Sequence, residues 1–252
     1  MNFIAIIIGA VTGFVSAFFG IGGSSIDTPV IRTFLGLPPL ESLATPLPLT
    51  VLTASIAMFS YRKMHLADYR IAGLSLITAV PAVVLGSLLT AHISGKFLML
   101  LTAVVLALVG IDFIVKNFTE KTLVISKPRK RPPAWQVLLV AGFIGILSGV
   151  LANGGGIFFV PAFVVFFRLR IKEAIATSLP LVLIIALPGS AVHLALGHVN
   201  LATMATMAIG VIPMAFVGAK LDIHTRSKLV MLLYGAVMFA FAVYFFISQL
   251  IG

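Results

Sequence analysis

Long apolar runs, separated by short polar breaks, dominate the chain. Eight of them approach the roughly 20 residues that a helix needs to cross a bilayer, and they are 2–19, 40–61, 71–91, 97–115, 135–151, 173–193, 201–219 and 229–250. Two further runs, 25–36 and 157–167, would cover only about 18 Å of a hydrocarbon core about 30 Å thick. We therefore expect an all-α polytopic membrane protein of ten helical segments, in which these two are half-helices or strongly tilted helices.

Composition supports a lipid environment. Hydrophobic residues make up 60% of the chain and charged residues only 10%, against about 45–50% and 25% in soluble domains. The chain has no cysteine, which excludes a disulfide scaffold and a cysteine-based zinc domain. No pattern indicates a cofactor or a bound metal.

The chain repeats itself at one constant offset in sequence, which is the offset from Pro29 to Pro161. Rare residues keep this register without a gap, which composition alone does not explain: the matches include Pro29/Pro161, Glu41/Glu173, Pro48/Pro180, Pro81/Pro213, His92/His224 and Lys96/Lys228. We read residues 1–116 and 135–252 as two copies of one unit of about five helical segments, joined by a basic linker at 117–134.

The basic residues predict how the copies are oriented. If each copy crosses the membrane an odd number of times, the second copy is inverted. This arrangement places the Lys and Arg residues on one side of the membrane, with only Arg32 and Lys96 on the other. Because basic loops stay in the cytoplasm, we expect inverted repeats with both termini outside and the basic loops and linker in the cytoplasm. The net charge of +10 then reflects topology.

The linker does not indicate nucleic-acid binding. Its segment 127–133 (KPRKRPP) is basic enough to rest on anionic headgroups of the bilayer, but it is far too short to form a folded basic domain.

Two glycine-rich breaks, 20–25 (GIGGSS) and 152–156 (ANGGG), precede the short segments. Free N–H groups and the positive dipole end of a helix that starts after such a loop favour an anion. Close helix packing is the alternative for these loop glycines. Packing is our interpretation for the small residues spaced by four just before each loop, which are Gly9, Gly13, Ala17, Ala141, Gly145 and Gly149.

Hydroxyl groups beside prolines form a second candidate element. Thr45 precedes Pro46 and Pro48, and its repeat equivalent Thr177 precedes Ser178 and Pro180. A proline inside a span bends the helix, so these hydroxyls could face a ligand. They could equally bond back to their own helix.

Few ionisable residues lie within the predicted spans. Asp27 could carry a coupling proton or balance the charge of Arg32, five residues later. We expect His193 and His198 to be solvated residues flanking an outer loop.

The motifs GIGGSSIDTPVI and ESLATPLPL, and their second copies NGGGIFFVPAF and EAIATSLPL, resemble the TauE/SafE family of sulfite exporters, also called 4-toluene sulfonate uptake permeases. The resemblance covers almost the whole chain, although Ser24 stands where the family usually has a third glycine. It implies a transporter in the inner membrane of a prokaryotic cell that moves small sulfur-containing anions such as sulfite, sulfoacetate, other sulfonates or thiosulfate. The residues predicted to contact substrate are Gly22, Gly23, Ser24, Ser25, Thr45, Asn153, Gly154, Gly155, Gly156, Thr177 and Ser178.

Inverted repeats with broken helices are typical of secondary transporters that work by alternating access. We therefore predict a permease whose partners are the lipid bilayer, a sulfur-containing anion and, where flux is coupled, a proton or sodium ion. The alternative is a proton- or cation-coupled transporter of a neutral or zwitterionic solute that uses Asp27. An enzyme is not expected, because no HExxH motif or cysteine occurs.

Overall fold

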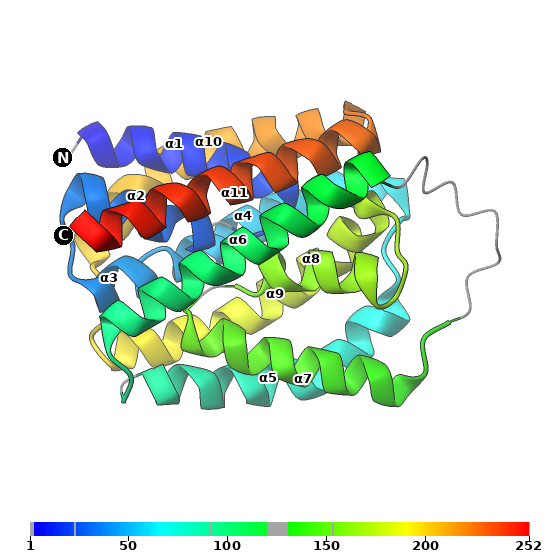
Figure 1. Cartoon of the computed structure of the whole chain (residues 1–252), viewed down its shortest axis with the longest axis horizontal. Helices are drawn as coiled ribbons and strands as arrows, with labels where there is room; N and C mark the ends of the chain where they lie inside the picture. Colours follow the sequence, from blue (N-terminus) through cyan, green and yellow to red (C-terminus); the bar gives the residue numbers. More distant parts are fainter. Residues whose placement is uncertain (1–2, 23, 91, 120–130, 153, 252) are drawn as a thin grey trace.

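The computed structural model describes residues 3–22, 24–90, 92–119, 131–152 and 154–251. Every regular element in these ranges is a helix (Figure 1). The helices are α1 (Phe3–Phe19), α2 (Ser24–Leu35), α3 (Pro39–Ala44), α4 (Leu47–Tyr61), the 3₁₀ turn η1 (Arg62–Met64), α5 (Tyr69–Thr90), α6 (Gly95–Thr119), α7 (Ala134–Val150), α8 (Gly156–Val165), α9 (Ile171–Ala195), α10 (Leu201–His224) and α11 (Ser227–Ile251).

The chain is a multi-pass membrane protein. Among the described residues, six helical stretches are long and apolar enough to cross a bilayer. Helices α1 and α7 have 17 residues each, and α8 has only 10. Large apolar side chains such as Phe3, Ile77 and Trp135 point outward, as expected where lipid replaces water as the solvent. The short segments expected around 25–36 and 157–167 are α2 and α8.

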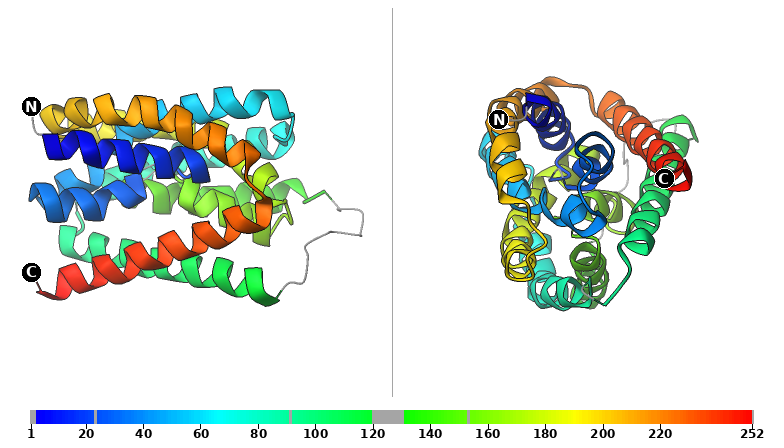
Figure 2. Two further views of the ribbon diagram at one scale, coloured as in Figure 1. Left: turned by 90° about the horizontal axis from the view of Figure 1, so that it is seen from above. Right: turned by 90° about the vertical axis from the view of Figure 1, so that its left-hand side faces the viewer.

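Helices of the two halves match in the register of the sequence repeat: α1 with α7, α2 with α8, α3 and α4 with α9, α5 with α10, and α6 with α11. The packing follows the same correspondence, since α1 packs on α10 while α7 packs on α5 (Figure 2). Helices α4 and α9 pack on one another, as do α6 and α11. Each half thus contributes one helix to each of these pairs.

The small residues before the glycine loops do pack closely, as predicted. A methyl group added at Gly13 would lie 2.7 Å from the Cα of Val211, and one at Gly145 would lie 2.7 Å from the carbonyl oxygen of Ala79. Val211 is the repeat equivalent of Ala79, as Gly145 is of Gly13, so the two contacts are equivalent. Helix backbones approach this closely only where side chains are minimal.

Two hydrogen bonds between the halves form another equivalent pair. The N–H of Asn200 donates to Oγ1 of Thr45 at 3.0 Å, and the N–H of Asp68 donates to Oγ1 of Thr177 at 2.9 Å. Asn200 and Asp68 precede α10 and α5, and their side chains accept the N–H groups of Thr203 and Ile71. These are N-caps of the usual kind, each held in place by a threonine of the other half.

The proline-containing spans differ between the halves. Helical hydrogen bonding is interrupted at Thr45–Pro46, between α3 and α4, although both residues keep helical dihedral angles. Helix α9 runs through Pro180 and Pro188 without a break. The first half carries prolines at 46 and 48, and neither residue has an N–H to donate; the second half has Ser178 at the position of Pro46.

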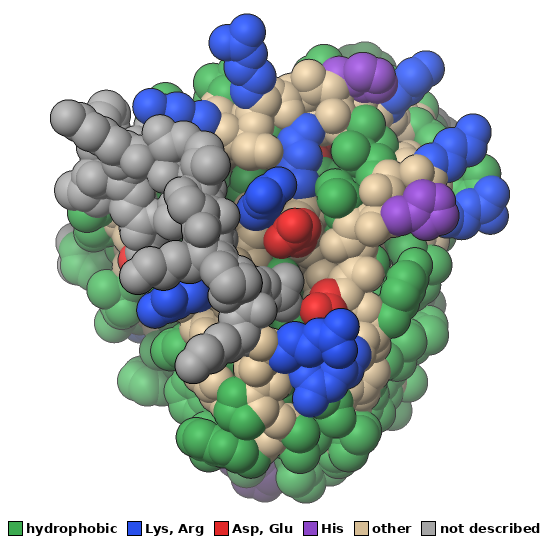
Figure 3. Space-filling view, turned by 90° about the vertical axis from the view of Figure 1, so that its right-hand side faces the viewer, with side chains coloured by type: hydrophobic (Ala, Val, Ile, Leu, Met, Phe, Trp, Pro, Cys, Tyr) green, Lys and Arg blue, Asp and Glu red, His purple; other side chains and the backbone are tan. Residues whose placement is uncertain are grey.

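Charge is segregated along the molecule. Helix α1 begins and α11 ends at the same end (Figure 1), and Lys and Arg side chains gather on the opposite face (Figure 3). The basic linker expected at 117–134 lies mostly outside the described residues.

Candidate functional site

Two short helices, α2 and α8, begin next to each other in the middle of the molecule and run toward opposite ends (Figures 1 and 2). The N–H of Gly154 donates to Oγ of Ser24 at 3.1 Å. A methyl group at Gly156 would overlap the carbonyl group of Ile21. The two glycine loops, which belong to different halves of the chain, therefore touch directly.

This meeting point is suited to an anion. The first N–H groups of a helix lack partners within the helix, and the macrodipole places positive charge there. Here two such ends converge inside the protein, where neighbouring Ile21 and Ile157 are each only 1% exposed. Electrostatic interactions are stronger in such low-dielectric surroundings than in water.

Helices α4 and α9 support both loops through one pair of side chains. A methyl group at Gly22 would lie 2.7 Å from Cγ2 of Thr50 and 2.7 Å from Cγ1 of Val182. One at Gly154 would meet the same two side chains. Thr50 and Val182 are themselves repeat equivalents, and Oγ1 of Thr53 donates to the carbonyl oxygen of Gly22 at 3.3 Å.

The loop glycines differ in backbone conformation. Gly22 and Gly155 have φ values of +83° and +77°, a region that side chains disfavour. Replacement of either residue therefore strains the backbone and cannot test ligand binding alone. Gly23 and Asn153, also predicted to contact substrate, lie outside the described residues. Ser25 lies in α2, but its side chain is outside the described part.

The hydroxyls near the prolines are engaged in structural contacts. Those of Thr45 and Thr177 accept the N–H groups of Asn200 and Asp68, and both threonines are fully buried. The hydroxyl of Ser178 donates to the carbonyl oxygen of Ile175 in its own helix at 3.0 Å. The sequence left open whether these hydroxyls face a ligand or bond back to their own helix. Of the three, only the hydroxyl of Ser178 bonds back to its own helix.

Asp27 lies in α2, one turn beyond the first loop, and is only 2% exposed. Its carboxyl group is hydrogen-bonded to the side chain of Thr12, and its Oδ1 has no partner. Arg32 instead donates to the carbonyl oxygen of Leu37 at 2.6 Å. Arg32 thus has a backbone partner, and charge balance between Asp27 and Arg32 stays a prediction.

Sequence analysis did not single out three ionisable side chains that have buried polar atoms without partners, which are Asp222, Tyr61 and Tyr234. Asp222 is fully buried in the last turns of α10 and neither carboxyl oxygen has a partner, while Lys172 donates to the backbone carbonyls of Asp222 and Ile223. Tyr234 in α11 and Tyr61 in α4 have buried hydroxyls without partners. An acidic residue this close to an apolar span could have indicated from the sequence that Asp222 is buried.

His193 is fully buried, so the expectation of a solvated loop histidine is wrong for it. The reason is that α9 extends to Ala195 and carries this side chain into the interior. Its Nδ1 lies 3.2 Å from Nδ1 of His198, which follows α9, and partial burial lowers the pKa of His198. In the described ranges, no group of His, Asp and Glu side chains is arranged to hold a metal ion.

Comparison with known proteins shows the family to which the chain belongs. The family model described as Sulfite exporter TauE/SafE matches residues 5–245. The chain belongs to the TauE/SafE family. It is 23% identical over 249 residues to "Probable membrane transporter protein YunE" of Bacillus subtilis, covering 90% of this chain and 89% of that protein.

This TauE/SafE protein has an archaeal relative too. It is 24% identical over 242 residues to "Probable membrane transporter protein MJ0441" of Methanocaldococcus jannaschii, covering 88% of this chain and 87% of that protein. No solved structure matches the chain. The family and these relatives make the TauE/SafE protein a membrane transporter and not an enzyme.

Proposed function

We propose that this TauE/SafE protein is a permease for small sulfur-containing anions such as sulfite, sulfoacetate or other sulfonates. The observation that carries the proposal is the meeting of the N-terminal ends of α2 and α8 at the two glycine loops. Backbone N–H groups and helix dipoles at such ends bind oxyanions without a cationic side chain. The family name, Sulfite exporter TauE/SafE, supports the choice of sulfur oxyanions.

The proposed mechanism is alternating access between two inverted repeats. Its support is the pairing of contacts: Thr45 with Asn200 and Thr177 with Asp68. Residues in a two-fold arrangement meet in this reciprocal way. Rocking of one repeat against the other would then expose the loops to each side in turn. The gathering of basic residues opposite the termini supports an inner-membrane placement with the termini outside.

The substrate proposal is tested by thermal unfolding of the purified protein in detergent with sulfite, sulfate, thiosulfate, sulfoacetate, taurine or chloride at equal ionic strength. A ligand that binds the native state raises its stability by about 2.7 kcal/mol at 100 times Kd. We expect saturable stabilisation by one sulfur oxyanion and none by chloride. Equal responses to all salts, or no response to any anion, would contradict the proposal.

A second candidate is a proton- or cation-coupled transporter of a neutral or zwitterionic solute that uses Asp27. The buried Asp27 Oδ1 without a partner favours it, because an unpaired carboxylate is unfavourable in the interior and a neutral acid is not. Asp27→Asn in proteoliposomes separates the two functions. Retained anion flux removes the second candidate, whereas loss in the variant of pH-dependent transport of a zwitterion such as taurine supports it; unchanged melting shows that the variant is folded.

A further inference from the structure

The hydroxyl group of Tyr234 is isolated in the core of the protein. The ring stacks on Phe113 with centroids 4.8 Å apart and meets the edge of Phe19 at 5.3 Å. The residue is 0% exposed, and its hydroxyl has no hydrogen-bond partner. Two aromatic neighbours therefore fix the ring, and the hydroxyl takes a defined direction.

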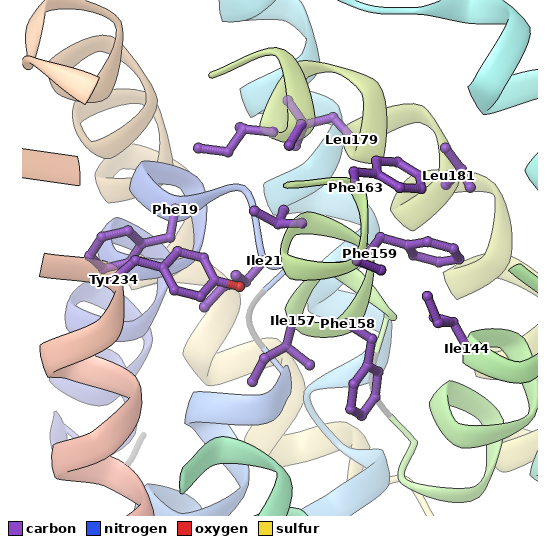
Figure 4. Packing of buried hydrophobic residues seen from close by; sticks show 14 of the residues in the cluster. Phe19, Ile21, Ile144, Ile157, Phe158, Phe159, Phe163, Leu179, Leu181 and Tyr234 are labelled. Carbon is purple, nitrogen blue, oxygen red and sulfur yellow. The ribbon is translucent and has the colours of Figure 1, made fainter. Parts of the chain in front are cut away.

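That direction is toward the first glycine loop. Figure 4 shows the Tyr234 side chain extending from α11 past Phe19, with its hydroxyl toward Ile21. The loop does not satisfy this hydroxyl. The N–H of Ile21 donates to the carbonyl oxygen of Ser16 at 3.1 Å, and the carbonyl group of Ile21 faces Gly156.

A phenylalanine would pack between the same rings without an unpaired polar group. Buried tyrosine hydroxyls usually find a partner, and leaving one unpaired is unfavourable. The hydroxyl is therefore an unpaired donor that points toward the first glycine loop (Figure 4), on a different element from the loop amides.

We propose that Tyr234 donates its O–H to the anion bound at the glycine loops and selects polyatomic oxyanions over halides. This inference rests on the proposed function. A sulfur oxyanion presents separate oxygen atoms to the loop N–H groups and to the phenol, whereas a halide has one atom for both. The phenol adds no charge, so it favours an acceptor oxygen without raising the affinity for every anion.

The test compares Tyr234→Phe with Tyr61→Phe. Each removes one buried hydroxyl without a partner and keeps the ring, and Tyr61 lies eight residues beyond Thr53 in α4, about 12 Å along the helix from the loop. Sulfite is titrated into each purified protein by calorimetry. We expect Tyr234→Phe to weaken sulfite binding by about 10- to 100-fold, as for loss of one hydrogen bond to a charged group, and Tyr61→Phe to bind as wild type.

Wild-type affinity in Tyr234→Phe, or an equal loss in Tyr61→Phe, would overturn the assignment of Tyr234 while leaving the anion site intact. Absence of sulfite binding by the wild-type protein would instead overturn the proposed function and this inference with it. Melting of each unliganded variant at or above the wild-type temperature is expected, because only an unpaired hydroxyl is lost.

Discussion

Replacing Gly149 with alanine is expected to destabilise the protein by about 3 kcal/mol, at the upper end of what overpacking a core costs. The added methyl group would overlap the carbonyl group of Val83 and lie 2.7 Å from the backbone nitrogen of Ser87. These atoms belong to the backbone of α5 and cannot turn aside, so α7 and α5 would have to separate. The melting temperature in detergent should fall by roughly 6–12 °C.

The matched control is Gly142→Ala on the same helix. There the nearest atom to an added methyl group is Cβ of Thr78 at 3.5 Å, an ordinary contact. Alanine favours a helix over glycine by about 1 kcal/mol, so this variant should melt at or slightly above the wild-type temperature. Similar melting of the two variants would contradict the close packing of α5 on α7.

Replacing Gly156 with alanine is expected to weaken anion binding strongly. Unlike Gly155, Gly156 is not among the residues with positive φ, so the backbone accepts a side chain at this position. The added methyl group would overlap the carbonyl group of Ile21 and force the two loops apart. Loss of two hydrogen bonds to a charged ligand, at about 1.5–3 kcal/mol each, would weaken binding by at least ~100-fold.

Sulfite titration and melting are measured together for this variant, with Gly73→Ala as the control because nothing lies within 4 Å of a methyl group there. A further test uses Gly154, whose close contact with a neighbouring side chain can be removed by a second substitution. A methyl group at Gly154 meets Cγ2 of Thr50, and Thr50→Ser removes that atom. Gly154→Ala should weaken binding because of this overlap, and adding Thr50→Ser to it should recover part of the loss. Wild-type affinity in Gly156→Ala would show that contact between the loops is not needed.

The helices could be predicted closely because their apolar runs are continuous and their polar breaks are short. The short α2 and α8 followed from length alone. The difference between the interrupted span at Thr45–Pro46 and the continuous α9 did not, because one proline bends a span without always breaking its hydrogen bonding. Two closely spaced prolines, at 46 and 48, accompany the interruption.

The candidate site was predictable only in its local part. Glycine runs before short helices indicate where backbone N–H groups are free, and the internal repeat indicates that two such runs exist. The partner of Thr45 is 155 residues away in sequence, and nothing near Thr45 indicates that its hydroxyl accepts the N–H of Asn200. Tyr234 reads as one more aromatic residue of an apolar helix, since the direction of its hydroxyl depends on Phe19 and Phe113.

The parallel packing of α1 on α10 has a consequence for biosynthesis. Gly9 and Gly13 of α1 face Met207 and Val211, which the ribosome adds about 200 residues later, roughly 10–40 s at ordinary rates of synthesis. During this interval the glycine face of α1 has no partner from its own chain. Assembly of the first half must therefore wait for translation of the second, and a nascent chain stalled before α10 would leave that face open to lipid or to an insertion factor.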